Sequence, residues 1–63
     1  MAYNVLIVED DPMVAMINEQ YILKNKNFKV CNSVRNGNEA IEFLEKNKID
    51  LVILDVYMPF MDG

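Results

Sequence analysis

The sequence predicts an α/β fold built on a parallel sheet. Two short apolar runs, Val5–Val8 and Leu51–Leu54, contain β-branched residues and no polar interruption. Such runs are typical of strands that are buried on both faces, as they are in parallel sheets. Two stretches with helical spacing and one weaker strand candidate lie between them. The resulting order, β-α-β-α-β, favours parallel strands joined by right-handed crossovers.

The first helix is expected to run from about Pro12 to Asn25. Proline suits the first helical position, and Asp11 directly before it is a good N-cap. Apolar residues at helical spacing predict that the inward face consists of Val14, Ile17 and Tyr21. Polar residues predict that the outward face consists of Asn18, Glu19 and Lys24.

A weaker strand is predicted to begin with Phe28–Cys31. Phe28 and Val30 alternate with Lys29, which indicates a strand with one wet face at the edge of a sheet. We expect Cys31 to be a small buried apolar residue.

The second helix is predicted over Asn38–Lys46. Turn residues precede it, and either Asn36 or Asn38 could be its cap. The apolar stripe of this helix is expected to consist of Ala40, Ile41, Phe43 and Leu44.

Composition limits the classes of function. The 63 residues make at most one small domain, and ten acidic against six basic residues give a net charge of -4. This charge disfavours nucleic acid as a partner of the segment, because phosphate binding needs basic patches. A single cysteine suits a reducing compartment. No run resembles a signal peptide or a membrane span, so we expect a cytoplasmic protein without a membrane partner.

The sequence stops in loop residues shortly after the third predicted strand, at Met61–Gly63. We therefore expect residues 1–63 to be one piece of a larger folding unit. No linker, repeat or composition change indicates a domain boundary inside the piece.

Acidic residues follow both continuous apolar runs. Glu9 and Asp10 follow the first run, and Asp55 follows the last. The carboxyl ends of parallel strands meet at one edge of the sheet, so neighbouring strands would bring these three carboxylates together. A divalent cation would relieve their repulsion. Oxygen ligands and the absence of histidine favour Mg²⁺, or Mn²⁺, with water and a phosphate group completing the coordination.

These motifs resemble the receiver domain of two-component response regulators. The resemblance lies in Val8–Pro12 after the first strand and in Leu54–Gly63 after the third. It covers the whole chain but only about the first half of a receiver. The family fold is flavodoxin-like (CheY-like), a doubly wound sheet of five βα units in the order 2-1-3-4-5. The resemblance implies that residues 1–63 are a partial receiver, truncated after the third strand, with strand order 2-1-3.

The resemblance also implies roles for individual residues. Asp55 would be the phosphoacceptor for a phosphoryl group carried by a sensor histidine kinase. Glu9, Asp10 and Asp55 would hold Mg²⁺, together with the backbone carbonyl of Tyr57. Whether Glu9, which stands where many members carry aspartate, reaches the metal directly or through water stays open. Asp11 fits a helix cap better than a ligand. Such a protein is a signalling phosphoacceptor rather than an enzyme.

A narrower resemblance concerns regulators of the citrate and C4-dicarboxylate sensing type. It lies in Pro12–Ala15 with Tyr21, and in Tyr57–Pro59. Those regulators carry a carboxyl-terminal DNA-binding domain, which implies a transcriptional output outside this chain.

The third strand would form an exposed apolar edge in a piece of this length, and such edges invite pairing. We therefore expect the isolated 63-residue chain to be oligomeric or strand-swapped.

Two other functions compete with the receiver. A phosphatase of the haloacid dehalogenase type also forms an aspartyl phosphate, but it needs a second aspartate where this chain has Tyr57. A flavodoxin-like nucleotide or flavin binder needs a phosphate-binding loop after the first strand. Three acidic residues at that position, Glu9 to Asp11, would repel phosphate unless a metal ion intervened.

Overall fold

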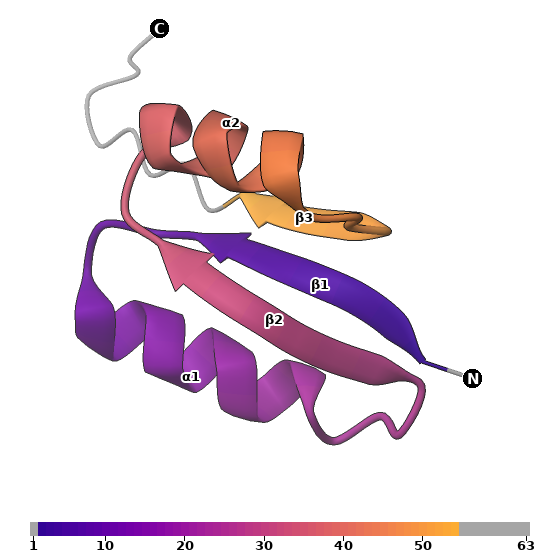
Figure 1. Ribbon diagram of the computed structural model, residues 1–63. Helices are drawn as coiled ribbons and strands as arrows, with labels where there is room; N and C mark the ends of the chain where they lie inside the picture. The colour runs from indigo at the N-terminus through magenta and orange to yellow at the C-terminus, as the bar shows by residue number, and fades with distance from the viewer. Residues whose placement is uncertain (1, 55–63) are drawn as a thin grey trace, which may run out of the picture.

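Three parallel strands carry one helix on each face of their sheet (Figure 1). This computed structural model describes residues 2–54. The elements in chain order are β1 Tyr3–Val8, α1 Pro12–Ile22, β2 Phe28–Val34, α2 Gly37–Lys46 and β3 Leu51–Leu54. The predicted site residues Asp55 and Tyr57 lie outside the described residues. Neither helix in the described part is long and apolar enough to cross a membrane.

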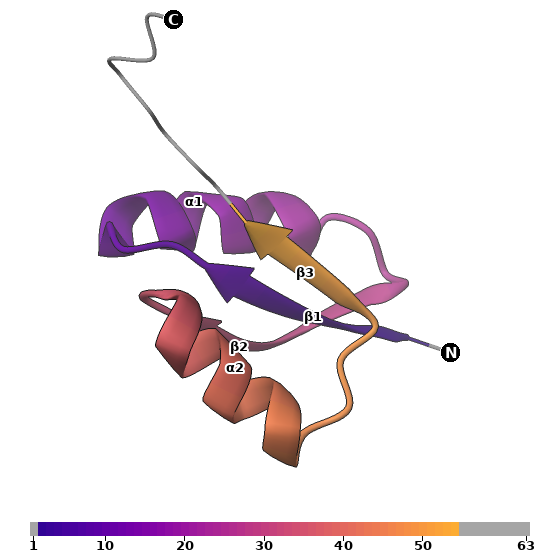
Figure 2. The ribbon, with the colours of Figure 1, turned by 90° about the horizontal axis from the view of Figure 1, so that it is seen from above.

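The strand order is β2-β1-β3, and both neighbouring pairs are parallel. The predicted α/β class and the predicted order 2-1-3 are therefore confirmed. β1 is the central strand, and Val5, Leu6 and Ile7 within it are 0% exposed. Seen from above, α1 and α2 lie on opposite sides of the sheet (Figure 2). The chain first passes from β1 to β2 and then returns past β1 to β3, in the opposite direction across the sheet. Because both connections are right-handed, the two helices lie on opposite faces.

The start of α1 is as predicted, and its end comes earlier. The side chain of Asp11 accepts a hydrogen bond from the N–H of Met13 at 2.9 Å, with proline at the first helical position. The helix ends at Ile22 and not at Asn25. The N–H of Asn25 donates to the carbonyl of Ile22, three residues back, so the chain tightens into a turn there.

The predicted inward face of α1 is correct only for Val14, which is half-buried. Ile17 and Tyr21 are 57% and 73% exposed, whereas Ala15 is buried. Asn18 and Glu19, predicted to face outward, are half-buried. The cause is that large apolar residues occur on most sides of this helix, so their spacing does not select one face. The small side chain of Ala15 allows the helix to lie close to the sheet.

β2 is an edge strand and begins at Phe28, both as predicted. It continues to Val34, and its register with β1 shifts at Cys31, because Val30 pairs with Val5 and Asn32 with Leu6. Cys31 is the extra residue of a β-bulge and is exposed, so the expectation that it is buried is wrong.

α2 begins one residue earlier than predicted and ends at Lys46 as expected. Asn36 is its cap, since its Oδ1 accepts from the N–H of Glu39 at 2.9 Å. Ala40 packs with Leu6, Val8 and Val34, while Phe43 and Ile49 cover this cluster. Ile41 and Leu44 are exposed, so only part of the predicted stripe faces the sheet.

β3 has the predicted bounds, and its exposure agrees with the apolar edge expected of a piece of this length. Leu51, Val52 and Leu54 are all exposed, Leu54 by 61%. Among the described residues β3 pairs with β1 alone, so it is an edge strand. A continuous apolar run indicates a buried strand only when both of its sides have neighbours.

Candidate functional site

The candidate site lies at the carboxyl edge of the sheet, where β1 ends in Glu9 and Asp10. The N–H of Glu9 donates to the carbonyl of Val34 at 2.9 Å, which extends the pairing of β1 and β2 by one residue. Glu9 is therefore held by the sheet, and it is only 9% exposed. Asp10 is exposed, so the pair combines one buried and one accessible carboxylate.

Hydrogen bonds in the loop after β1 orient the side chains of Glu9 and Asp11. Oε2 of Glu9 accepts a hydrogen bond from the N–H of Asp11 at 3.1 Å. The side chain of Asp11 turns instead to the start of α1, where it caps Met13. The prediction that Asp11 is a helix cap is confirmed. The short loop thus joins the end of β1 to the start of α1 through two hydrogen bonds.

The third predicted carboxylate, Asp55, falls outside the described residues, and so does Tyr57. The register of the neighbouring strand is described up to its last residue: Leu54 pairs with Val8. Within residues 2–54 no group of three cysteine, aspartate or glutamate side chains is placed to hold a metal ion. The site residues predicted from the sequence therefore stay predictions.

The donors that are described suit a hard cation. Glu9 and Asp10 offer carboxylate oxygen atoms, and the sequence contains no histidine. The one thiol, that of Cys31, belongs to the bulge within β2 and not to this edge. Oxygen ligands alone are what Mg²⁺ prefers, and it commonly binds through one or two carboxylates plus water and phosphate.

A hollow of about 380 Å³ opens beside the acids, between α1 and the end of β2. It is lined by Glu9, Asp10, Pro12, Ala15, Met16, Glu19, Ser33 and Arg35. Arg35 did not enter the sequence-based site because the sequence set no end for the second strand, which was expected to begin with Phe28–Cys31. Had that strand been extended to Val34, the rule used for Glu9 and Asp55 would have placed Arg35 at the same edge.

The fold and the acidic edge define the class of protein, and sequence comparison gives the family. The profile of the response regulator receiver domain matches residues 5–63. The chain belongs to this family. No solved structure matches the chain.

Among similar proteins are two kinds of regulator. The chain is 46% identical over 61 residues to the probable C4-dicarboxylate response regulator DctR of Bacillus subtilis (strain 168), covering 97% of the chain and 27% of the relative. It is 43% identical over 63 residues to the transcriptional regulatory protein CitT of Halalkalibacterium halodurans, covering 97% of the chain and 27% of that relative. The narrower resemblance to citrate and C4-dicarboxylate regulators is thus confirmed.

A third relative is covered over a larger share of its length. The chain is 38% identical over 63 residues to the chemotaxis protein CheY of Bacillus subtilis (strain 168), covering all of the chain and 52% of CheY. The chain spans about a quarter of the length of the DctR and CitT relatives and about half of CheY. The family match favours a receiver over a dehalogenase-type phosphatase and over a flavin or nucleotide binder.

Proposed function

We propose that Asp55 accepts a phosphoryl group from the phosphohistidine of a sensor histidine kinase. One observation carries the proposal: the acid pair at the end of β1 stands directly after Val8, which pairs with Leu54, the residue before Asp55. Neighbouring parallel strands lie about 4.8 Å apart. When two residues are paired on neighbouring parallel strands, the residues directly after them continue from the same edge of the sheet.

The transfer is a substitution at phosphorus. A carboxylate oxygen of Asp55 forms a bond to the phosphorus atom, while the bond from phosphorus to the histidine nitrogen breaks and leaves its electron pair on that nitrogen. Such transfers depend mainly on positioning and on charge stabilisation. Bound Mg²⁺ would supply positive charge that stabilises the phosphoryl oxygens.

Glu9, Asp10, Asp55 and the backbone carbonyl of Tyr57 are the proposed holders of Mg²⁺, with Mn²⁺ as the alternative ion. The described half of this set supports the assignment. Glu9 is fixed by its backbone bond to Val34, and Asp10 is accessible from solvent. The phosphoacceptor is used once in each signalling cycle, so the only chemistry proposed for this segment is its own phosphorylation and dephosphorylation.

Transcriptional control is the proposed output of the whole protein. The DctR relative is a probable C4-dicarboxylate response regulator, and the CitT relative is a transcriptional regulatory protein. We assign residues 1–63 to the first part of the receiver and any DNA contact to a part of the protein beyond it, since the segment carries a net charge of -4. A cytoplasmic location completes the proposal, because the exposed thiol of Cys31 suits a reducing compartment.

The test compares wild-type full-length protein with the Asp55→Asn variant. Each is incubated with Mg²⁺ and acetyl phosphate, and phosphorylation is read from intact mass. We expect one added phosphoryl group on the wild type and none on Asp55→Asn. Asp11→Asn is the matched control, because it removes a neighbouring carboxylate while asparagine keeps the helix cap. Equal labelling of the wild type and Asp55→Asn would remove Asp55 from the role.

A further inference from the structure

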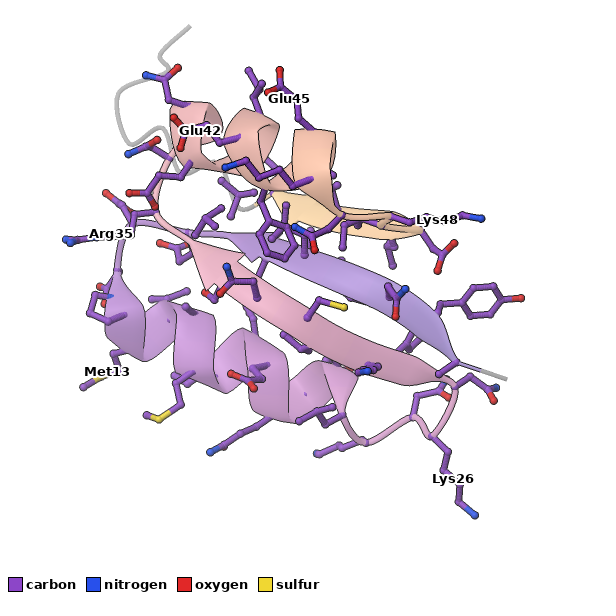
Figure 3. The ribbon with its side chains drawn as sticks, viewed as in Figure 1. Met13, Lys26, Arg35, Glu42, Glu45 and Lys48 are labelled. Carbon is purple, nitrogen blue, oxygen red and sulfur yellow. The ribbon has the colours of Figure 1, made fainter. Side chains whose placement is uncertain are left out.

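Most basic residues of the chain lie toward the edge of the sheet where the strands begin. All six lie in the described part of the chain: Lys24, Lys26, Lys29, Arg35, Lys46 and Lys48. The five lysines end α2, follow the end of α1 or α2, or lie near the start of β2, which places them toward the amino edge of the sheet. Arg35 alone follows the end of a strand. In Figure 3, Arg35 lies at the same end of the molecule as Met13, and Lys26 and Lys48 lie at the other end.

Arg35 shares one hollow with the acid pair. Three carboxylates line that hollow, those of Glu9, Asp10 and Glu19, and Arg35 supplies its one cation. The backbone N–H of Arg35 donates to Oε1 of Glu39 at 2.9 Å. This bond to the first turn of α2 fixes the position of the Arg35 backbone. Its guanidinium group is exposed and forms no ion pair or hydrogen bond with any residue that the structure describes.

An acidic edge has an electrostatic difficulty as a site for phosphoryl transfer. Glu9 and Asp10 attract a metal ion, but they repel the phosphoryl donor, which is itself an anion. A cation at the wall of the same hollow reduces that repulsion without occupying the place of the metal. Arginine suits such a position, since its planar group pairs readily with phosphate oxygens.

The geometry points to Arg35 as a positioning residue that draws the anionic phosphoryl group of the donor to the acidic edge. This inference rests on the proposed function, because it concerns the same transfer to Asp55. Arg35 acts on the negative charge of the phosphoryl group, which a small-molecule donor and a phosphohistidine both carry. Its effect should therefore not depend on the leaving group of the donor.

One substitution should then have two effects of opposite sign. Arg35→Gln removes a cation, so it should slow phosphorylation by an anionic donor and strengthen the binding of Mg²⁺. At a separation on the order of 10 Å, one charge changes the interaction with a divalent ion by about threefold at low ionic strength. Both effects should shrink toward none at high salt, where charges at this distance are screened.

The experiment uses full-length protein and two donors, acetyl phosphate and phosphoimidazole, the second of which has the P–N bond of phosphohistidine. Phosphorylation rates are measured at low and high salt, and Mg²⁺ affinity is measured separately by calorimetry. We expect Arg35→Gln to be about threefold slower with both donors at low salt and to bind Mg²⁺ about threefold more tightly. Arg35→Lys should keep most of the wild-type rate. Lys26→Gln, which loses the same charge at the opposite edge, should match the wild type.

Several results would overturn the role of Arg35. These are a rate for Arg35→Gln equal to that of Lys26→Gln, a loss confined to acetyl phosphate, or a loss that persists at high salt together with weaker Mg²⁺ binding. The last result would indicate a merely structural defect. If Asp55→Asn is not labelled while Arg35→Gln reacts at the wild-type rate, the phosphoacceptor stands and the role of Arg35 falls. Equal labelling of Asp55→Asn and the wild type would overturn both.

Discussion

Two side chains fix where the helices begin, and both stand at the acidic edge of the sheet. Oδ1 of Asp11 accepts from the N–H of Met13, and Oδ1 of Asn36 accepts from the N–H of Glu39. Each bond satisfies one of the backbone donors that a helix leaves open in its first turn. The caps therefore stabilise the two connections that carry Asp10 and Arg35.

The cap at Asp11 gives a prediction about stability. Asp11→Ala removes the acceptor for Met13 and should lower the free energy of unfolding of the full-length receiver by about 1 kcal/mol. Asp11→Asn should have a much smaller effect, because asparagine caps about equally well. Urea denaturation followed by circular dichroism measures both changes. Equal losses in the two variants would show that charge, and not capping, is the contribution of this side chain.

At the scale of elements, α1 shows how a helix chooses its buried face. Ala15 is buried against the sheet, and Ile17 and Tyr21 are more than half exposed. The length of the connections on either side of α1 limits how the helix can rotate. A small residue facing the sheet then permits close packing, whichever large residues lie elsewhere.

The buried position of Ala15 predicts a cost for enlarging it. Ala15→Leu adds carbon atoms between α1 and the sheet, and this overpacking should destabilise the full-length receiver by about 1–3 kcal/mol. Gln20→Leu is the matched control, since it places the same side chain at an exposed position of the same helix. Thermal unfolding of the two variants makes the comparison. A melting temperature for Ala15→Leu as high as that of Gln20→Leu would contradict the described face.

The two edge strands differ in what they present to solvent. β2 has a bulge at Cys31 and a lysine at position 29, features that discourage pairing with another strand. β3 has neither feature and is made only of leucine, valine and isoleucine. β3 is therefore the edge at which a further strand pairs most readily.

For the molecule as a whole, this edge predicts association when residues 1–63 are produced alone. β3 exposes much of its apolar surface, and an apolar hollow lies beside it, lined by Tyr21, Ile22, Asn25, Phe28, Leu51 and Ile53. We expect the 63-residue chain to form dimers or larger species, by pairing or exchange of strands. Light scattering coupled to size exclusion gives the mass. A well-folded monomer would contradict the prediction.

A single charge on β3 tests which strand is responsible. Leu54→Lys replaces the most exposed residue of β3 by lysine, which discourages pairing between edge strands. It should shift the 63-residue chain toward the monomer, whereas Lys29→Gln on β2 should leave the distribution unchanged. A shift of the same size in both variants would indicate a general effect of charge.

The sequence by itself determined the order of the elements, the cap at Asp11 and the position of Glu9 and Asp10 after a central strand. These features depend on residues close together in the chain: turn chemistry, a proline at a helix start, and apolar runs that end in acids. The parallel order then follows from general rules of chain connection. The roles of Asp55 and Tyr57 remain predictions from the family resemblance.

Tertiary structure alone decided which side of α1 is buried and how far β2 continues past the bulge at Cys31. Each of these depends on contacts between segments far apart in the chain, and local spacing does not encode such contacts. The length of β2 had a direct consequence for the site. Pairing with β1 continues to Val34, so Arg35 follows β2 at the edge where Glu9 follows β1.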